Sequence, residues 1–274
     1  MPIFQITPKL KIHYLEYNPR GYASVLLLHG LGASGSSWIL QIPALVDAGY
    51  HVIAPDIRGF GQSTYPGGKV RISDLAADMV RLLDHLKTSP ARVVGISLGG
   101  TVALQIALDA PAQVKSLVLV NTFASLRPKS LEVWIYFALR FLLVHTLGLP
   151  VQARAVANRI FPGADQDVLR QELIKQICQA DPNGYRAVMR ALAVFNVAKR
   201  LGEIQIPTQI ITSKDDTTVP CDVQLELVHG LPAAEHILIP DAGHAAIVDQ
   251  PELFNCHLLE FLNRAQSNDL KSTD

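Results

Sequence analysis

The chain has 274 residues and no formal net charge at pH 7, because 24 Lys and Arg balance 24 Asp and Glu. This length suffices for one large hydrophobic core, and the balanced charge excludes the positive field that attracts proteins to nucleic acid or anionic lipid. The three cysteines, Cys178, Cys221 and Cys256, are odd in number and widely spaced, which argues against a disulfide framework and a zinc site. We therefore expect a small-molecule substrate, no nucleic-acid partner, no metal and no cofactor.

The N-terminal residues 1–8 lack the basic segment and apolar run of a secretory signal, so we expect a cytoplasmic protein. The most apolar stretch, residues 133–144, is short for a membrane span and contains Arg140. It predicts a buried or substrate-covering helix rather than an integral membrane segment. The sequence carries no signal for a particular oligomeric state.

Six short, nearly continuous apolar runs predict parallel strands that are buried on both faces. Helical patterns lie between these runs, and this alternation predicts an α/β fold: a mostly parallel sheet flanked by helices. Residues 12–17 alternate weakly and predict an antiparallel edge strand. The predicted strands are 25–28, 51–54, 92–95, 116–120, 208–212 and 236–239, and the predicted helices are 38–48, 72–86, 101–109, 223–231 and 252–264.

The strand-and-helix alternation stops between residues 125 and 201, where helix formers dominate and turn residues divide the segment into four helical pieces. Because this segment follows the strand 116–120, it should emerge at the carboxyl ends of the strands, where open α/β sheets bind ligands. We therefore expect residues 1–124 and 202–274 to form an α/β core, and residues 125–201 to form an inserted helical lid.

A serine lies at the turn between the strand 92–95 and the helix 101–109, within the sequence Gly95-Ile96-Ser97-Leu98-Gly99. Glycines on both sides allow a turn too tight for larger side chains. Such an elbow presents Ser97 to a substrate and predicts a nucleophile.

A serine nucleophile needs a base, and the base needs an acid to hold it. His244 follows the strand 236–239 in a loop, which places it at the same edge of the sheet as Ser97. Asp215 and Asp216 both follow the strand 208–212. Adjacent side chains leave an extended loop in different directions, so only one of the two can face the imidazole. Asn121 also ends a strand, but an amide cannot stabilise an imidazolium as a carboxylate does.

These motifs together resemble the α/β-hydrolase superfamily over nearly the whole chain, and in particular its carboxylesterase-like serine hydrolases with a helical lid. Residues 29–34, His-Gly-Leu-Gly-Ala-Ser, resemble the family's oxyanion loop, and residues 55–63 contain its D-x-R-G-x-G-x-S turn. The serine, acid and histidine loops then follow in the family's order. The resemblance implies structural roles for His29, which shapes its loop, and for Arg58, which ties turns together.

The resemblance also implies which groups complete the site. In the family the acid stands four residues before a proline, which favours Asp216 because Pro220 follows at that spacing; Ser213 stands where glycine is common. The oxyanion donors would be the backbone N–H groups of Leu98 and Leu31.

A serine at the elbow favours acyl transfer, because relatives that attack carbon, such as dehalogenases, use a carboxylate there. Frequency within the family favours carboxylic ester hydrolysis, with Ser97 attacking, His244 moving the proton and Asp216 stabilising the imidazolium. Two alternatives stay open: an enol-lactone or carbon–carbon-bond hydrolase of the same fold, and a ligand receptor or signalling protein with slow hydrolysis.

The lid segment provides the only information on substrate. Its apolar side chains predict an apolar ester of small to medium size. Three arginines, Arg127, Arg140 and Arg154, are candidates to meet a substrate carboxylate, which the lactone and carbon–carbon alternatives would require. The aromatic residues expected to line the lid are Trp134, Tyr136, Phe137, Phe141, Phe161 and Phe195.

Overall fold

The computed structural model describes residues 2–126 and 131–271, and it has the predicted α/β architecture. Eight strands form one sheet in the order β1-β2-β4-β3-β5-β6-β7-β8. Neighbouring strands from β4 to β8 in this order pair in parallel, whereas β2 is antiparallel to both of its neighbours. The strands are β1 Ile3–Thr7, β2 Leu10–Tyr17, β3 Ser24–Leu28, β4 His51–Pro55, β5 Ala91–Ile96, β6 Val114–Val120, β7 Thr208–Ser213 and β8 Ala234–Ile239.

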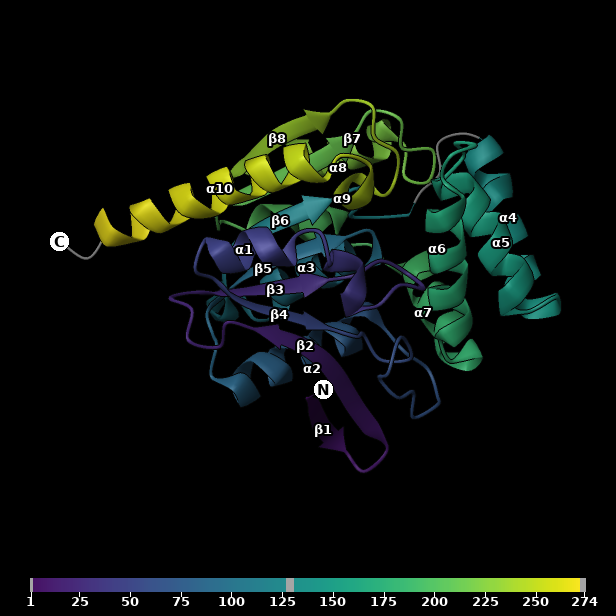
Figure 1. Cartoon of the computed structure of the whole chain (residues 1–274), viewed down its shortest axis with the longest axis horizontal. Helices are drawn as coiled ribbons and strands as arrows, with labels where there is room; N and C mark the ends of the chain where they lie inside the picture. The colour runs from purple at the N-terminus through teal and green to yellow at the C-terminus, as the bar shows by residue number, and fades with distance from the viewer. Residues whose placement is uncertain (1, 127–130, 272–274) are drawn as a thin grey trace.

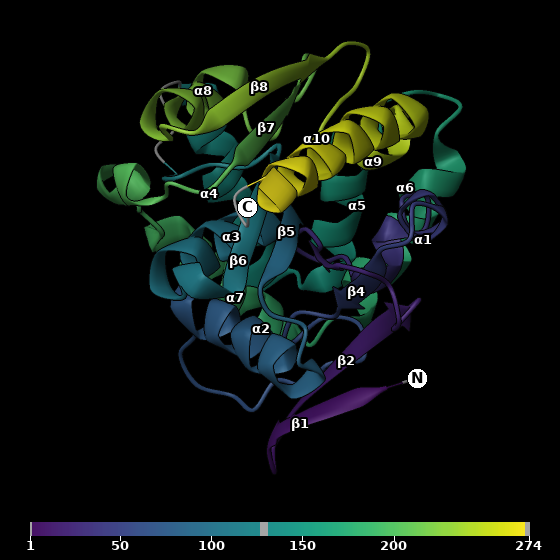
Figure 2. The ribbon, with the colours of Figure 1, turned by 90° about the vertical axis from the view of Figure 1, so that its left-hand side faces the viewer.

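The central strands are apolar without alternation because helices cover both faces of the sheet. On β3, Leu26 and Leu28 belong to one hydrophobic cluster, and Val25 and Leu27 belong to the other. Helices α2 and α3 cover the first face, and α1 and α10 cover the second (Figure 2). These helices are α1 Ile42–Asp47, α2 Ile72–Leu86, α3 Leu98–Asp109 and α10 Pro251–Lys271.

Two sequence expectations about the N-terminal third were wrong in detail. The strand β2 does not form the edge of the sheet, because β1 pairs on its outer side. The helix expected over 38–48 is divided into a 3-10 turn, Gly35–Trp38, and α1, in which Pro43 occupies the first turn. Proline is tolerated there but not in a helix interior, because it lacks an N–H group. The helix therefore begins beside Pro43 rather than at Trp38.

Four helices lie between β6 and β7 in the chain, beyond the ends toward which the parallel strands point (Figure 1). They are α4 Leu131–Thr146, α5 Leu149–Ile160, α6 Asp167–Gln179 and α7 Pro182–Val194, followed by a 3-10 turn, Ala198–Glu203. The breaks match the turn residues: Gly148 has a φ of 81°, and the Asp181 carboxylate accepts hydrogen bonds from the first N–H groups of α7. None of the helices in the described residues has the length and apolar run that a bilayer span requires.

Three further helical segments lie among the described residues: one before β6, one after β7 and one after β8. They are the 3-10 turn Pro111–Gln113, α8 Cys221–Gly230 and α9 Ala246–Asp249. Helix α8 packs beside β7, and the short helix α9 leads into α10. Both helices follow loops that contribute to the candidate site.

Hydrogen bonds join the turn of residues 55–63 to neighbouring segments, and Arg58 connects it to helix α2 rather than to another turn. The buried Asp56 carboxylate accepts hydrogen bonds from the N–H groups of Gly35 and Gln62, each at 2.8 Å. The Arg58 guanidinium donates two hydrogen bonds, of 2.5 and 2.6 Å, to the Asp78 carboxylate on α2. Burial raises the pKa of Asp78 even though the Arg58 charge opposes the shift. The ionised form of the buried Asp78 carboxylate is therefore stabilised by its hydrogen bonds and ion pair with Arg58.

Replacing Arg58 by methionine is expected to lower the free energy of unfolding by about 3 kcal/mol, because the fully buried Asp78 would keep, among the described cations, only the longer contact with Arg81 at 3.8 Å. Urea denaturation measures the change. Lys175→Met is the matched control: Lys175 pairs with Glu172 at 3.4 Å on the surface, and its loss should cost less than about 1 kcal/mol. Equal effects of the two substitutions would contradict the assignment.

Candidate active site

Ser97 occupies a strained turn between β5 and α3. Its φ is 53° and its ψ is −115°, a conformation that residues with a side chain rarely adopt. Three hydrogen bonds hold the turn: the Ser97 N–H donates to Val120 at 2.9 Å, and the Ser97 carbonyl accepts from Thr101 N–H and Thr122 Oγ1. The backbone is therefore fixed by its neighbours while the Ser97 side chain stays partly exposed.

The glycines beside Ser97 are required by close backbone contacts. A Cβ on Gly99 would lie 2.0 Å from the carbonyl oxygen of Leu28, and a Cβ on Gly95 would lie 2.3 Å from that of Gly99. Both distances are far below any van der Waals contact. The G-x-S-x-G pattern is thus explained by the packing of α3 against β3 and β5.

His244 and Asp216 come together from the loops that follow β8 and β7. His244 Nδ1 lies 2.8 Å from Asp216 Oδ2, and both side chains are buried. The other carboxylate oxygen accepts hydrogen bonds from the N–H groups of Thr218 and Val219, which fixes the orientation of Asp216. Asp215, the alternative acid, is exposed to solvent. Of the two aspartates, the structure brings Asp216 to the imidazole.

Asn121 holds the histidine loop, a role that our sequence reasoning missed. Its amide nitrogen donates to the carbonyl oxygens of His244 and Gly243, at 3.0 and 3.2 Å, and to Ser213 Oγ at 2.8 Å. Its amide oxygen accepts from the Ser213 N–H at 2.8 Å. The available signal was a buried polar residue at the end of an apolar strand, because such a residue needs partners. Asn121 therefore ties the ends of β6 and β7 to the loop that carries His244.

Asp249 holds the same loop from the other side. Its Oδ2 accepts the Gly243 N–H at 2.9 Å. Burial raises the pKa of Asp249, Asp216 adds to the shift, and the Gly243 N–H and His244 oppose it. The folded chain thus binds this proton more tightly than the unfolded chain does.

The raised pKa of Asp249 predicts that the stability of the protein changes with pH. Because the pKa of Asp249 is raised on folding, its contribution to the free energy of unfolding should fall as the pH rises from about 4 toward 7. Asp249→Asn keeps an acceptor for the Gly243 N–H and removes this titration. Urea denaturation of both proteins across this pH range should show the wild type losing stability relative to the variant. A difference that is constant with pH would refute the linkage.

Leu98 and Leu31, whose N–H groups are the expected oxyanion donors, both lie near Ser97. Leu98 is the first residue of α3, so its N–H has no acceptor within the helix. The second loop also runs close by, because a Cβ on Gly30 would lie 3.7 Å from the Ser97 Cβ. Leu31 follows Gly30 and lines the same cavities as Ser97.

His29 is a structural residue, as the resemblance implied. Its Nε2 accepts the Ile57 N–H at 2.9 Å, and its Nδ1 lies 2.8 Å from the Gly30 carbonyl oxygen. The ring is completely buried, and burial lowers the pKa of His29. The neutral imidazole therefore joins the loop after β3 to the turn after β4.

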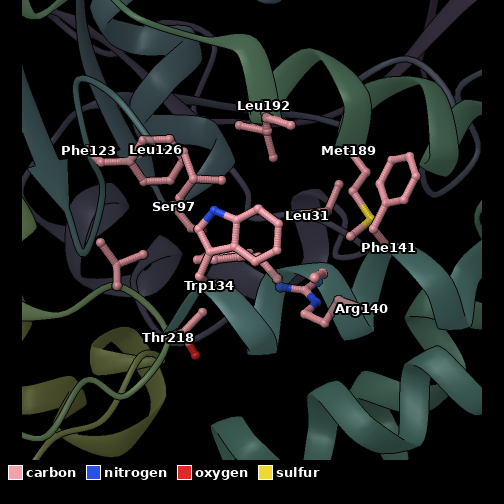
Figure 3. A pocket seen from close by; sticks show the side chains of 14 residues that line it. Leu31, Ser97, Phe123, Leu126, Trp134, Arg140, Phe141, Met189, Leu192 and Thr218 are labelled. Carbon is pink, nitrogen blue, oxygen red and sulfur yellow. The ribbon is translucent and has the colours of Figure 1, made fainter. Parts of the chain in front are cut away.

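Ser97 opens onto two adjoining cavities under α4–α7. One has a volume of about 440 Å³ and the other of about 510 Å³, and both are lined by Leu31, Ser97, Arg140 and Thr218. His244 lines the second cavity together with Ser97. Figure 3 shows the first cavity, with Trp134 and Arg140 reaching into it from α4 and Ser97 at its base.

The aromatic residues expected at the lid divide into two groups. Trp134, Phe137 and Phe141 line the first cavity, and Phe161 lines the second. Tyr136 and Phe195 line neither. Tyr136 stacks with Arg140 and Arg159, and Phe195 is part of a hydrophobic core cluster.

The comparisons with known proteins agree with this fold. A family model described as "alpha/beta hydrolase fold" matches residues 23–146. A protein of Variovorax paradoxus is 35% identical over 264 residues, which cover 94% of this chain and 98% of that protein. The chain belongs to the α/β-hydrolase family and is a hydrolase of this fold.

The relatives differ in the activity that their names state. The Variovorax paradoxus protein is provisionally named carbamate hydrolase RutD. The enol-lactonase of Burkholderia xenovorans is 26% identical, with a TM-score of 0.86 over 96% of this chain and 100% of that one. A thermophilic esterase of Thermogutta terrifontis is also 26% identical, with a TM-score of 0.82 over 93% of this chain and 94% of that one.

Proposed function

We propose that this chain is a serine hydrolase that cleaves carboxylic esters of small to medium, largely apolar substrates through an acyl-enzyme intermediate. The observation that carries the proposal is the arrangement around one cavity: Ser97 on its strained turn, and His244 held 2.8 Å from Asp216. A serine hydroxyl is a weak nucleophile, and an oriented imidazole is what activates it.

In the proposed mechanism, Ser97 Oγ attacks the ester carbonyl carbon while Nε2 of His244 takes the hydroxyl proton. Asp216 accepts a hydrogen bond from Nδ1 and stabilises the imidazolium that forms. His244 then returns the proton to the alcohol as it leaves, which produces the acyl-enzyme. Water attacks the acyl group with His244 again as the base, and the acid is released.

The N–H groups of Leu98 and Leu31 are proposed to stabilise the negative oxygen of the tetrahedral intermediate. Each such donor contributes roughly 3 kcal/mol when it is aimed at the oxyanion rather than at the planar ester. Backbone donors are suited to this task because the elbow and the loop of residues 29–34 are fixed by their own hydrogen bonds.

We also propose that residues 125–201 act as a lid over a core of residues 1–124 and 202–274. The cavities beneath α4–α7 are in the size range of small-molecule sites, and their lining is mostly apolar. A largely apolar acyl or alcohol portion therefore fits them. Longer chains would have to displace Trp134, Phe141 or Met189.

The esterase among the structural relatives supports ester hydrolysis, and the enol-lactonase supports a second candidate. A lactone is a cyclic ester, so the same groups could open it. The carbamate hydrolase named among the relatives would also act at an acyl carbon. Ester, lactone and carbamate hydrolysis would all use the same attack by Ser97 on an acyl carbon, so these three candidate activities differ only in the substrate.

A substrate panel tests the proposal. Purified protein is assayed with 4-nitrophenyl esters from acetate to laurate, an enol lactone and an aryl carbamate. We expect many turnovers per molecule, with kcat/KM highest for short to medium acyl chains. A higher kcat/KM on the lactone or the carbamate would favour that activity instead. Release of a single nitrophenol per molecule would identify a receptor with slow hydrolysis.

A further inference from the structure

Arg140 is a charged side chain that the proposed mechanism does not use. It extends from α4 and is only 7% exposed. It lines both cavities together with Ser97. In Figure 3 its guanidinium is directed toward the middle of the cavity, beside the Trp134 ring. A buried cation in the wall of the candidate active site requires an explanation.

The partners of Arg140 in the described part of the chain are all neutral. One Nη2–H donates to the Tyr185 hydroxyl at 3.2 Å. With the Gln152 amide turned so that both its atoms are satisfied, its oxygen accepts from Nε at 2.9 Å. The Tyr136 ring lies 5.5 Å from the guanidinium carbon. Tyr136 also contributes a polar contact to the guanidinium, so the hydrogen-bond partners of Arg140 among the described side chains are two tyrosines and one amide, none of which carries a charge to balance it.

Among the described side chains, no buried carboxylate in the cavity walls balances this charge. Among the described residues that line the first cavity, Arg140 is the only one with a permanent charge. The second cavity also contains Glu172, but that side chain is half exposed and pairs with Lys175. Of the other two arginines considered from the sequence, Arg154 is exposed, and Arg127 lies outside the described residues.

A buried guanidinium without a counter-charge destabilises a fold, because the ion loses its hydration and gains no equivalent partner. The fold nevertheless positions this one: Tyr185 and Gln152 bind two of its nitrogens, Tyr136 is a further neutral partner, and the guanidinium still lines both cavities. Such a group is suited to bind an anion that enters with the substrate.

We propose that Arg140 binds a carboxylate of the substrate, so that the preferred ester carries a free carboxylate on its acyl or its alcohol part. The planar guanidinium matches a planar carboxylate with two parallel hydrogen bonds. One cation in an otherwise apolar cavity balances one negative charge, whereas a phosphate dianion would stay partly unpaired. This proposal rests on the proposed ester hydrolysis and narrows its substrate class.

Two pairs of esters test the proposal, each differing only in charge. The acyl pair is 4-nitrophenyl hydrogen adipate and its primary amide; the adipate chain is too long for efficient attack on its own ester. The alcohol pair is 4-carboxyphenyl hexanoate and 4-carbamoylphenyl hexanoate. For at least one pair, the wild type should prefer the acid by about 10-fold or more in kcat/KM, as expected for a desolvated charged hydrogen bond.

Arg140→Gln should lower kcat/KM for that acid by about 10-fold to 100-fold and change the matched amide by less than about 3-fold. Arg140→Lys should recover part of the preference for the acid over the amide, because lysine carries the positive charge but lacks the planar guanidinium that forms two parallel hydrogen bonds. Arg154→Gln, on the exposed face of α5, is the matched control and should leave both rates unchanged. Equal rates on acid and amide in both pairs would overturn the proposal.

Two further measurements keep the test decisive. Thermal unfolding of Arg140→Met should show a Tm that is unchanged or raised, because the substitution removes an unbalanced buried charge. A large fall in Tm would assign Arg140 a structural role instead.

Calorimetric titration of Ser97→Ala with adipate monoamide and with adipamide separates binding from hydrolysis. Tighter binding of the charged compound, lost in the Ser97→Ala/Arg140→Gln double variant, would support the carboxylate site even if no ester were cleaved.

Discussion

Ser97→Ala is expected to lower kcat on the best ester of the panel by about 10⁴-fold or more, while KM changes little. Without Oγ no acyl-enzyme can form, and only the slow attack of water, aided by the oxyanion donors, is left. Because the Ser97 hydroxyl is partly exposed and the turn is held by backbone hydrogen bonds, the fold should be unaffected. Steady-state kinetics and Tm measure the two effects separately.

Ser37→Ala is the matched control for this experiment. Ser37 lines the second cavity, but its hydroxyl donates to the Ser34 carbonyl oxygen at 2.7 Å and is not on the elbow. Its removal should change kcat by less than about 3-fold. If Ser97→Ala kept more than about a tenth of the activity, the nucleophile would have to be another group.

Asp216→Asn is expected to lower kcat by about 10³-fold to 10⁴-fold, whereas Asp215→Asn should change it by less than about 3-fold. The carboxylate at 216 lies 2.8 Å from Nδ1 of His244, and in the proposed mechanism it balances the imidazolium charge. An amide offers its NH₂ or its neutral oxygen at that position, so it can hold the wrong tautomer and cannot balance the charge. Asp215 is exposed and contributes its N–H to the Ala242 carbonyl oxygen, which asparagine retains.

The two aspartate variants also test our choice of acid. Similar, mild losses in both would reject Asp216, and a severe loss only in Asp215→Asn would transfer the role to its neighbour. Stability is a necessary control, because Asp216 also accepts the N–H groups of Thr218 and Val219. Kinetics should therefore be measured at a temperature at which all variants are folded.

Much of the fold could be predicted because apolar continuity marks buried strands. The runs that became β3 to β8 were each found, and α2 was predicted at Ile72–Leu86, its observed bounds. The strand β1 was missed because only its alternate side chains are partly buried. The division of the helix at Pro43 shows a local steric rule overriding helical periodicity.

Those parts of the candidate site that lie within a local sequence motif could be predicted. The elbow at Ser97 is a local pattern, since its glycines are required by contacts within β3, β5 and α3. The choice between Asp215 and Asp216 depended on the resemblance, because two adjacent residues share one sequence environment. The role of Asn121 could not be assigned from sequence, and Arg140 could not be chosen from among Arg127, Arg140 and Arg154. Both assignments depend on which distant segments meet at the carboxyl edge of the sheet.

The most direct test of the central claim is a crystal structure of the protein after reaction with a 4-nitrophenyl alkylphosphonate. Our account predicts a phosphorus–oxygen bond to Ser97 Oγ, with the phosphonyl oxygen accepting the N–H groups of Leu31 and Leu98. His244 should lie within hydrogen-bonding distance of the adduct, and the alkyl chain should occupy the cavity beside Trp134 and Phe141. An adduct on any other residue, or an unmodified Ser97 in fully inactivated protein, would contradict the account.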